Sequence, residues 1–95
     1  MNLHQVFTSP SSDHQLQQCI RRCQSGDGIL LLQDGIYSLK HPLLGRAVEL
    51  GIVLYVLQKD LAARGLTLDN QSIQVVDDKQ WLALCVQYDK VLSWV

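Results

Sequence analysis

Two cysteines four residues apart, Cys19 and Cys23, are the first candidates for chemistry in this sequence. On one helix this spacing turns both thiols to the same face, where they can supply half of a zinc site. The remaining ligands are not in place along the sequence, because Cys85 stands alone and the three histidines are scattered. The spacing rules of zinc sites are unmet, so the sequence predicts no metal site.

A reactive thiolate is the second chemistry that this pair permits. Thiolates form where a helix N-terminus or a neighbouring cation lowers the thiol pKa. Both cysteines are expected in the middle of a helix, on its apolar face and away from its N-terminus. We therefore interpret Cys19, Cys23 and Cys85 as small core residues, a common role of free cysteine.

Two aspartates, Asp34 and Asp60, each follow an apolar run that predicts a buried strand. Parallel strands would bring both carboxylates to one edge of the sheet, where paired carboxylates can perform acid–base catalysis. Turns and helix starts also favour aspartate, so we prefer a capping role for both residues. Arg64 fits an anion site, but an arginine at this place is more often a solvated helix end.

Size and composition indicate one globular domain over residues 1–95. Of the 95 residues, 47% are hydrophobic and 18% are charged, which excludes a disordered chain. Eight basic and nine acidic side chains leave a net charge of −1, without the basic patch that nucleic-acid binding requires. Neither a signal peptide nor an apolar run of about 20 residues is found, so we expect a cytoplasmic protein with reduced cysteines.

The strands that must position these residues follow from the apolar runs. Residues 29–32 and 52–57 are apolar without interruption, which is typical of strands buried on both faces of a parallel sheet. Further strands are predicted over residues 3–7, 72–76 and 91–95. Residues 72–76 alternate between polar and apolar side chains, which favours a position nearer the sheet edge.

Helices are predicted between the strands, over residues 13–23, 43–50, 61–64 and 79–87. A capping box of Ser12 and Gln15 should begin the first helix. Its apolar face is formed by Leu16, Cys19, Ile20 and Cys23. Polar residues 58–60 should separate the third strand from its helix, and Gly65 should end that helix in the left-handed conformation.

The last helix should be capped by Asp77 or Asp78. The side chains that it is expected to bury are Trp81, Leu82, Cys85 and Tyr88. Residues 36–40 fit either a short strand or the entry to a helix. Strands that alternate with helices predict an α/β fold, a three-layer α/β/α sandwich around a mostly parallel five-stranded sheet.

Three stretches together resemble the TusB/DsrH family of DsrE/F/H-like sulfur-relay subunits. They are residues 30–37 (LLLQDGIY), residues 54–57 leading into 60–65 (DLAARG), and the C-terminal Trp94. The opening residues 4–10 are also similar to the N-terminal strand of that family. The similarity covers essentially the whole chain in matching order, and it implies the fold predicted above.

The resemblance implies a subunit of a heterohexamer with homologous C-type and D-type (DsrF-like and DsrE-like) chains. Such TusBCD-like complexes relay persulfide sulfur through downstream carriers to the wobble uridine of tRNA, which becomes 2-thiolated. The relay cysteine of the D-type chain follows its third strand, and the equivalent position here is at or near Leu57, which cannot carry a persulfide. The resemblance therefore implies a non-catalytic B-type subunit that has no activity on its own and binds no cofactor. We expect it to contact neither nucleic acid nor a membrane directly.

Two alternatives stay open. DsrH-type members carry a cysteine in the first helix, in a context like residues 16–19, which implies a sulfur-oxidation relay with Cys19 as a secondary sulfur acceptor. The other alternative is an unrelated small-molecule-binding domain that uses Asp34, Asp60 and Arg64 at the sheet edge.

Overall fold

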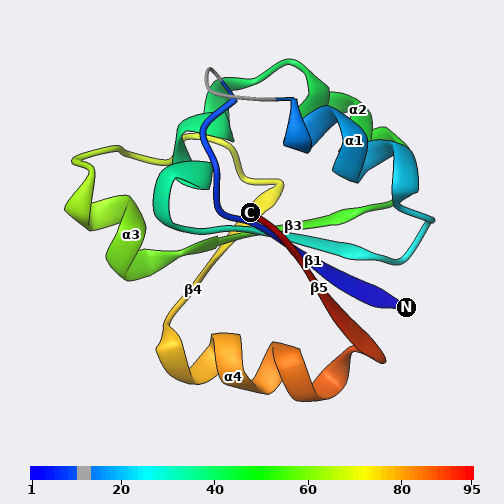
Figure 1. Cartoon of the computed structure of the whole chain (residues 1–95). Helices are drawn as coiled ribbons and strands as arrows, with labels where there is room; N and C mark the ends of the chain where they lie inside the picture. Colours follow the sequence, from blue (N-terminus) through cyan, green and yellow to red (C-terminus); the bar gives the residue numbers. More distant parts are fainter. Residues whose placement is uncertain (11–13) are drawn as a thin grey trace.

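Five parallel strands form the sheet at the centre of this protein, seen in a computed structural model that describes residues 1–10 and 14–95 (Figure 1). The strands are β1 (Asn2–Val6), β2 (Gly28–Leu31), β3 (Val53–Leu57), β4 (Ile73–Val76) and β5 (Lys90–Trp94). Their order is β4-β3-β2-β1-β5, and every neighbouring pair is parallel. This confirms the predicted α/β class, and β4 lies at a sheet edge as expected.

The helical segments are α1 (Gln15–Arg22), the 3-10 helix η1 (Gln33–Lys40), α2 (Leu43–Glu49), α3 (Gln58–Ala63) and α4 (Asp78–Gln87). Residues 36–40, which fitted a strand or a helix entry, belong to η1. The predicted break at residues 58–60 is wrong, because α3 begins directly after β3 and includes them. Glutamine and lysine are good helix formers, and an aspartate in the first turn suits the helix dipole.

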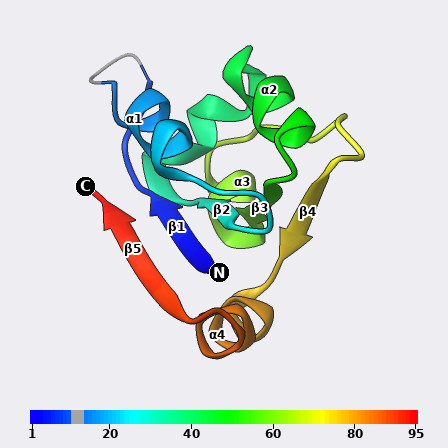
Figure 2. The ribbon, with the colours of Figure 1, turned by 90° about the vertical axis from the view of Figure 1, so that its right-hand side faces the viewer.

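The order of the strands determines which face each helix covers. From β1 to β4 the chain adds strands in one direction, and right-handed crossovers place α1 and α2 on the same face. The chain then returns beneath the sheet through α4, so that β5 pairs with β1 on the opposite side. Figures 1 and 2 show α1 and α2 on one face and α4 on the other, which is the predicted three-layer arrangement.

Alternation along the strands divides the core between these two faces. On β1, His4 and Val6 point toward α1, whereas Leu3 and Gln5 point toward α4. Helix α1 buries Leu16, Cys19 and Ile20 and leaves Cys23 half-buried, which confirms its predicted apolar face. The predicted cap Ser12 lies outside the described residues, and the described helix has His14 at its N-cap position.

Helix α4 is capped as predicted, and it packs Trp81, Cys85 and Tyr88 half-buried against the core, but one expected residue differs. Asp77 and Gln80 form a reciprocal capping box. The predicted burial of Leu82 is wrong, since 67% of Leu82 is exposed and Leu84 is the buried leucine. The cause is the orientation of the helix on the sheet, which the hydrogen bond from Trp81 Nε1 to Gln5 Oε1 helps to hold at 3.1 Å.

The end of α3 has its expected form. Gly65 has a φ of +63° directly after α3, which is the predicted left-handed helix end. Among the described residues, no helix has both the length and the apolar character that a bilayer-spanning segment requires.

The two leucines of α4 provide a matched test of this packing. Leu84→Ala should lower the free energy of unfolding by about 2–4 kcal/mol, because it leaves a cavity against the sheet. Leu82→Ala should change it by less than about 0.5 kcal/mol, because that side chain is mostly in water. Urea unfolding of both variants measures the difference, and equal losses would contradict the observed orientation of α4.

Candidate functional site

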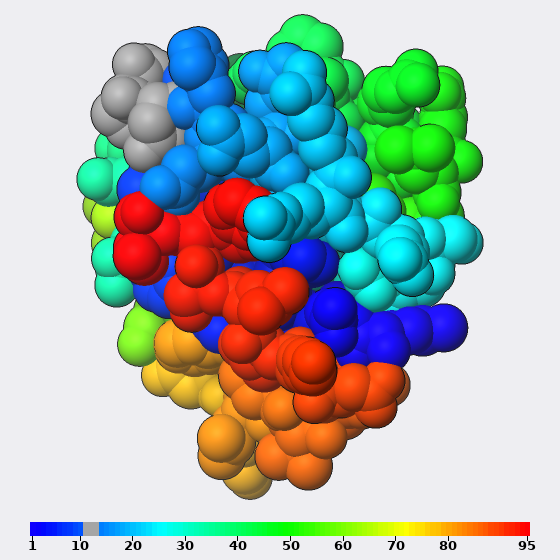
Figure 3. All heavy atoms as spheres, turned by 45° about the vertical axis from the view of Figure 1, so that its right-hand side comes forward, coloured from blue at the N-terminus to red at the C-terminus, as the bar shows by residue number. Residues whose placement is uncertain are grey.

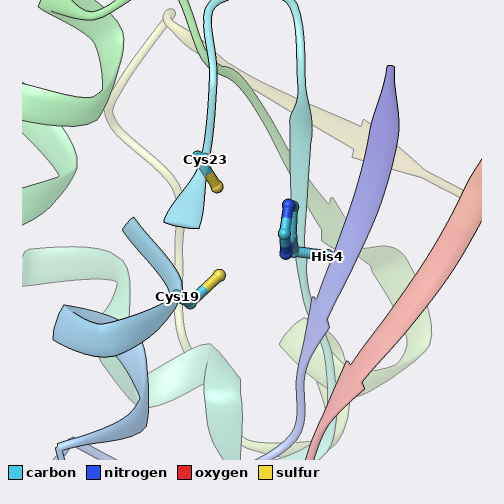
Figure 4. A group of neighbouring side chains, drawn as sticks. All are labelled: His4, Cys19 and Cys23. Carbon is cyan, nitrogen blue, oxygen red and sulfur yellow. The ribbon is translucent and has the colours of Figure 1, made fainter. Parts of the chain in front are cut away.

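Three side chains that are far apart in the sequence meet on the α1 face of the sheet. The sulfur atoms of Cys19 and Cys23 and a ring nitrogen of His4 all lie within 4.8 Å of one another. Figure 4 shows both sulfurs pointing from α1 toward the imidazole that β1 presents. Cys19 and His4 are buried, whereas Cys23 is half-buried.

The local structure explains why α1 delivers both thiols to this place. Cys19 belongs to the last full turn of the helix, and Cys23 is the C-cap residue. The backbone N–H of Cys23 still bonds to the carbonyl oxygens of Cys19 and Ile20, so the two side chains stay on one face. At Cys23 the backbone becomes extended, with φ −72° and ψ 145°, and the chain turns toward β2.

Both nitrogens of the His4 ring have partners. Nε2 lies 3.3 Å from Oδ2 of Asp27, and Trp94 Nε1–H donates to Nδ1 at 3.2 Å. The indole can donate only to an Nδ1 without a proton, so in neutral His4 the proton is on Nε2 and faces Asp27. Asp27 also accepts hydrogen bonds from the backbone N–H groups of Asn2 and Gln24.

These contacts separate the acidities of the two thiols. The Cys19 thiol donates to the Cys23 sulfur, and together with His4 it lowers the pKa of Cys23 to about 6, against the opposing effect of burial. The same hydrogen bond and complete burial raise the pKa of Cys19. The negative charge therefore belongs on Cys23, and Cys19 stays a thiol.

The imidazole and the carboxylate support this charge distribution. The hydrogen bond with Cys23, and after it the contact with Asp27, raise the pKa of His4 although burial lowers it. Burial raises the pKa of Asp27, but its hydrogen bonds from Asn2, Gln24 and His4 outweigh burial and lower it. Protonation of His4 at Nδ1 would break the bond from Trp94, so the indole opposes the imidazolium.

The sheet-edge residues also meet, but they neutralise one another. Arg64 lies 3.0 Å from Asp34 and 3.9 Å from Asp60, as expected of residues at one carboxyl edge. The predicted capping of α3 by Asp60 is wrong, because its carboxylate instead accepts the backbone N–H of Gln33 at 2.7 Å. Gln33 has a φ of +50°, which a residue with a side chain rarely adopts, and Asp60 stabilises it there.

Comparison with known proteins identifies the family. The family model described as DsrH like protein matches residues 8–91 of the chain. The chain belongs to this family. A protein named TusB from Pectobacterium parmentieri is 32% identical, over 97% of this chain and 99% of its own length. A protein of the same name from Erwinia tasmaniensis is 34% identical with the same coverage.

A solved structure supports the fold independently. The solution NMR structure of protein Tm0979 from Thermotoga maritima matches this DsrH-like chain with a TM-score of 0.71. The match covers 92% of this chain and 93% of the other at 21% identity, so it carries information about the fold and not about function. The match to the family model and the similarity to the TusB proteins confirm the predicted resemblance to the TusB/DsrH family of sulfur-relay subunits.

Leu57, the position that the resemblance aligns with a relay cysteine, is inaccessible in this DsrH-like chain. Leu57 ends β3, is fully buried and packs in the core beneath α4. The next residue, Gln58, is exposed but carries no nucleophile. Neither side chain of this turn provides a thiol. Among the described residues, the Cys19–Cys23–His4–Asp27 cluster brings two thiols to an imidazole, whereas the half-buried Cys85 packs against the core beneath α4.

The same cluster is less suited to a metal ion than to thiol chemistry. His4, Cys19 and Cys23 offer nitrogen and sulfur ligands, so the fold supplies the histidine that the sequence spacing seemed to lack. A ligating histidine needs a free lone pair, however, and here Nδ1 accepts from Trp94 while Nε2 is directed at Asp27. A metal ion would have to displace the indole from His4.

A pocket near the sheet edge gives little support to small-molecule binding. It has a volume of about 290 Å³ and lies between η1 and residues 65–67. Asp34, Asp60 and Arg64 do not line it. Their charges are used to join η1 to α3, which is a structural role.

Sequence reasoning missed His4, Asp27 and Trp94 as members of the site. One signal was available: on a strand with Val6 at the core, alternation places His4 on the same buried face. Asp27 between two glycines has the pattern of a turn residue, and its three hydrogen bonds depend on the fold.

The pH dependence of Cys23 alkylation tests the electrostatics of the site. With iodoacetamide we expect a rate that is full above pH 7 and falls as the pH drops through about 6, because only the thiolate reacts. Cys19→Ala should move this midpoint upward by removing the main hydrogen-bond donor, and Cys19→Ser should move it less. Quenched alkylation with peptide mass spectrometry measures each rate. A wild-type midpoint near the ordinary value of about 8.5 would refute the arrangement.

Proposed function

We propose that this chain is the B-type subunit of a TusBCD-like heterohexameric sulfurtransferase complex in the cytoplasm. The complex relays persulfide sulfur for 2-thiolation of the wobble uridine of tRNA, with the main relay cysteine on the D-type chain. Similarity to proteins named TusB supports this assignment. The buried Leu57 agrees with it, because this chain offers no thiol at or near the relay position.

The observation that carries the proposed assembly is the apolar exterior of α4 and β5. On α4, 67% of Leu82 and 80% of Val86 are exposed, one helical turn apart. On the neighbouring edge strand, Val91 is paired with Leu3 and so lies on the α4 face of the sheet, where it is also exposed. Figure 3 shows α4 and β5 side by side on one face of the molecule.

A homologous C-type or D-type chain is the occupant that fits this surface. Exposed apolar side chains on a helix, next to an edge strand with unpaired backbone groups, are typical of a protein interface. Asp78, Lys79 and Lys90 are exposed near these apolar side chains, and charged groups around an apolar patch are common in subunit contacts.

The second candidate is a DsrH-type subunit of a sulfur-oxidation relay, in which Cys19 accepts sulfur. The placement of Cys19 beside Cys23 and His4 favours some thiol chemistry on this chain. Complete burial and a raised pKa make Cys19 itself the weaker nucleophile of the pair. Both candidates place the chain in a sulfur relay among homologous subunits.

Coexpression with C-type and D-type chains tests the proposed assembly. We expect the three chains to copurify, with a mass by light scattering that corresponds to two copies of each. Recovery of this chain only as a free species, while the two partners associate without it, would overturn the proposal.

Charge substitutions locate the interface. Leu82→Lys or Val86→Lys should reduce copurification at least tenfold, because a lysine ammonium would have to be desolvated in an apolar contact. Val48→Lys on α2 is the matched control, since 39% of Val48 is exposed on the other face. Unchanged thermal unfolding would show that the variants fold, and equal losses from all three would contradict an interface on α4.

A further inference from the structure

We propose that Cys23 is a sulfane-sulfur acceptor of this chain, with Cys19 and His4 as positioning residues held by Asp27. The inference rests on the proposed function, because it assigns a site for the sulfur that such a complex carries. The proposed acceptor, Cys23, differs from Leu57, which the resemblance aligns with the relay cysteine of the D-type chain. It also differs from Cys19, the acceptor in the second candidate function.

Access separates the two thiols. Cys19 has no exposed surface, whereas Cys23 is half-buried where α1 passes into the loop before β2. A donor from outside therefore meets Cys23 first, and Figure 4 shows the Cys23 sulfur on the same side of the imidazole as that of Cys19.

Neighbouring side chains, and not the helix dipole, stabilise a thiolate at Cys23. The C-terminal end of a helix disfavours a negative charge, so the dipole of α1 does not stabilise a thiolate at Cys23. The groups that face it are the Cys19 thiol on α1, His4 on β1 and Asp27 in the loop before β2. The first two stabilise the thiolate, and Asp27 opposes it but holds His4 in place.

A positive charge lies close to the cluster as well. The guanidinium of Arg22, the residue before Cys23, is 5.9 Å from the ring centroid of Trp94, which in turn bonds to His4. This cation favours the approach of a donor that carries carboxylates, such as glutathione persulfide.

The transfer requires no oxidant or reductant. The Cys23 thiolate attacks the outer sulfur of a donor persulfide R–S–SH and forms a new S–S bond with it. The S–S bond of the donor breaks, and the donor leaves as the thiolate R–S⁻. Cys23 then carries –S–SH with the proton that the outer sulfur already had, so atoms, charge and oxidation states balance. Cys19 stays a thiol throughout and donates to the charged sulfur.

The expected rate follows from the ionised fraction. At pH 6 about half of Cys23 is ionised, against about 0.3% of a thiol with the ordinary pKa of about 8.5. A more acidic thiolate is also a weaker nucleophile, which removes about tenfold of that advantage. The net expectation is that Cys23 loads about tenfold faster than free cysteine at pH 6.

The test treats the full chain with glutathione persulfide, blocks all sulfur species by alkylation and maps the adducts by peptide mass spectrometry. We expect the added sulfur on Cys23. Cys23→Ser should abolish loading, Cys85→Ser should leave it unchanged, and Cys19→Ala should slow it at pH 6 with rescue by Cys19→Ser. Sulfur on Cys19 or Cys85, or none on Cys23 of the wild-type chain, would overturn the inference without depending on the folding of any variant.

The two proposals fail separately. The Cys23→Ser chain should still assemble with C-type and D-type partners if the proposed function holds. Assembly without loading of Cys23 would refute this inference alone, and loading without assembly would refute the proposed function alone.

Discussion

The buried carboxylate of Asp27 is the constraint on which the site depends. A carboxylate withdrawn from water is costly unless hydrogen bonds replace its hydration. Asp27 meets this requirement with the N–H of Asn2 at the start of β1, the N–H of Gln24 after α1, and Nε2 of His4. The position of the imidazole and the end of α1 are thus set by one side chain, and Cys23 is brought to His4 as a result.

The asymmetry between the two cysteines follows from this placement. Cysteines that react as thiolates commonly use a helix N-terminus, whereas Cys23 lies at the opposite end of α1. Its charge therefore depends on two side chains, Cys19 and His4, which are both withdrawn from solvent. A hydrogen bond in such an environment is stronger than in water, and for that reason the loss of one donor has a large effect on the thiolate.

The fold was largely predictable from the sequence, and the site was not. Strands buried on both faces leave unbroken apolar runs, which is why the ranges predicted at residues 29–32 and 52–57 lie within one residue of β2 and β3. The prediction that Leu82 is buried was wrong because contacts with the sheet, such as the hydrogen bond from Trp81 to Gln5, determine the rotation of α4 about its axis. His4 and Cys23 are neighbours only because α1 packs on β1. This contact between distant residues cannot be predicted from the spacing of residues along the sequence.

Two features of this DsrH-like chain lie on opposite faces of the sheet. Leu57 ends β3 in the core beneath α4, and the thiol cluster lies beneath α1 near the amino ends of the strands. The sheet itself separates them, and close packing of its side chains leaves no path for sulfur between the two positions. Sulfur on Cys23 would therefore have to arrive from another molecule and depart to one. The proposed interface on α4 and β5 would leave this exchange unobstructed, because Cys23 lies at the end of α1, on the other face of the sheet.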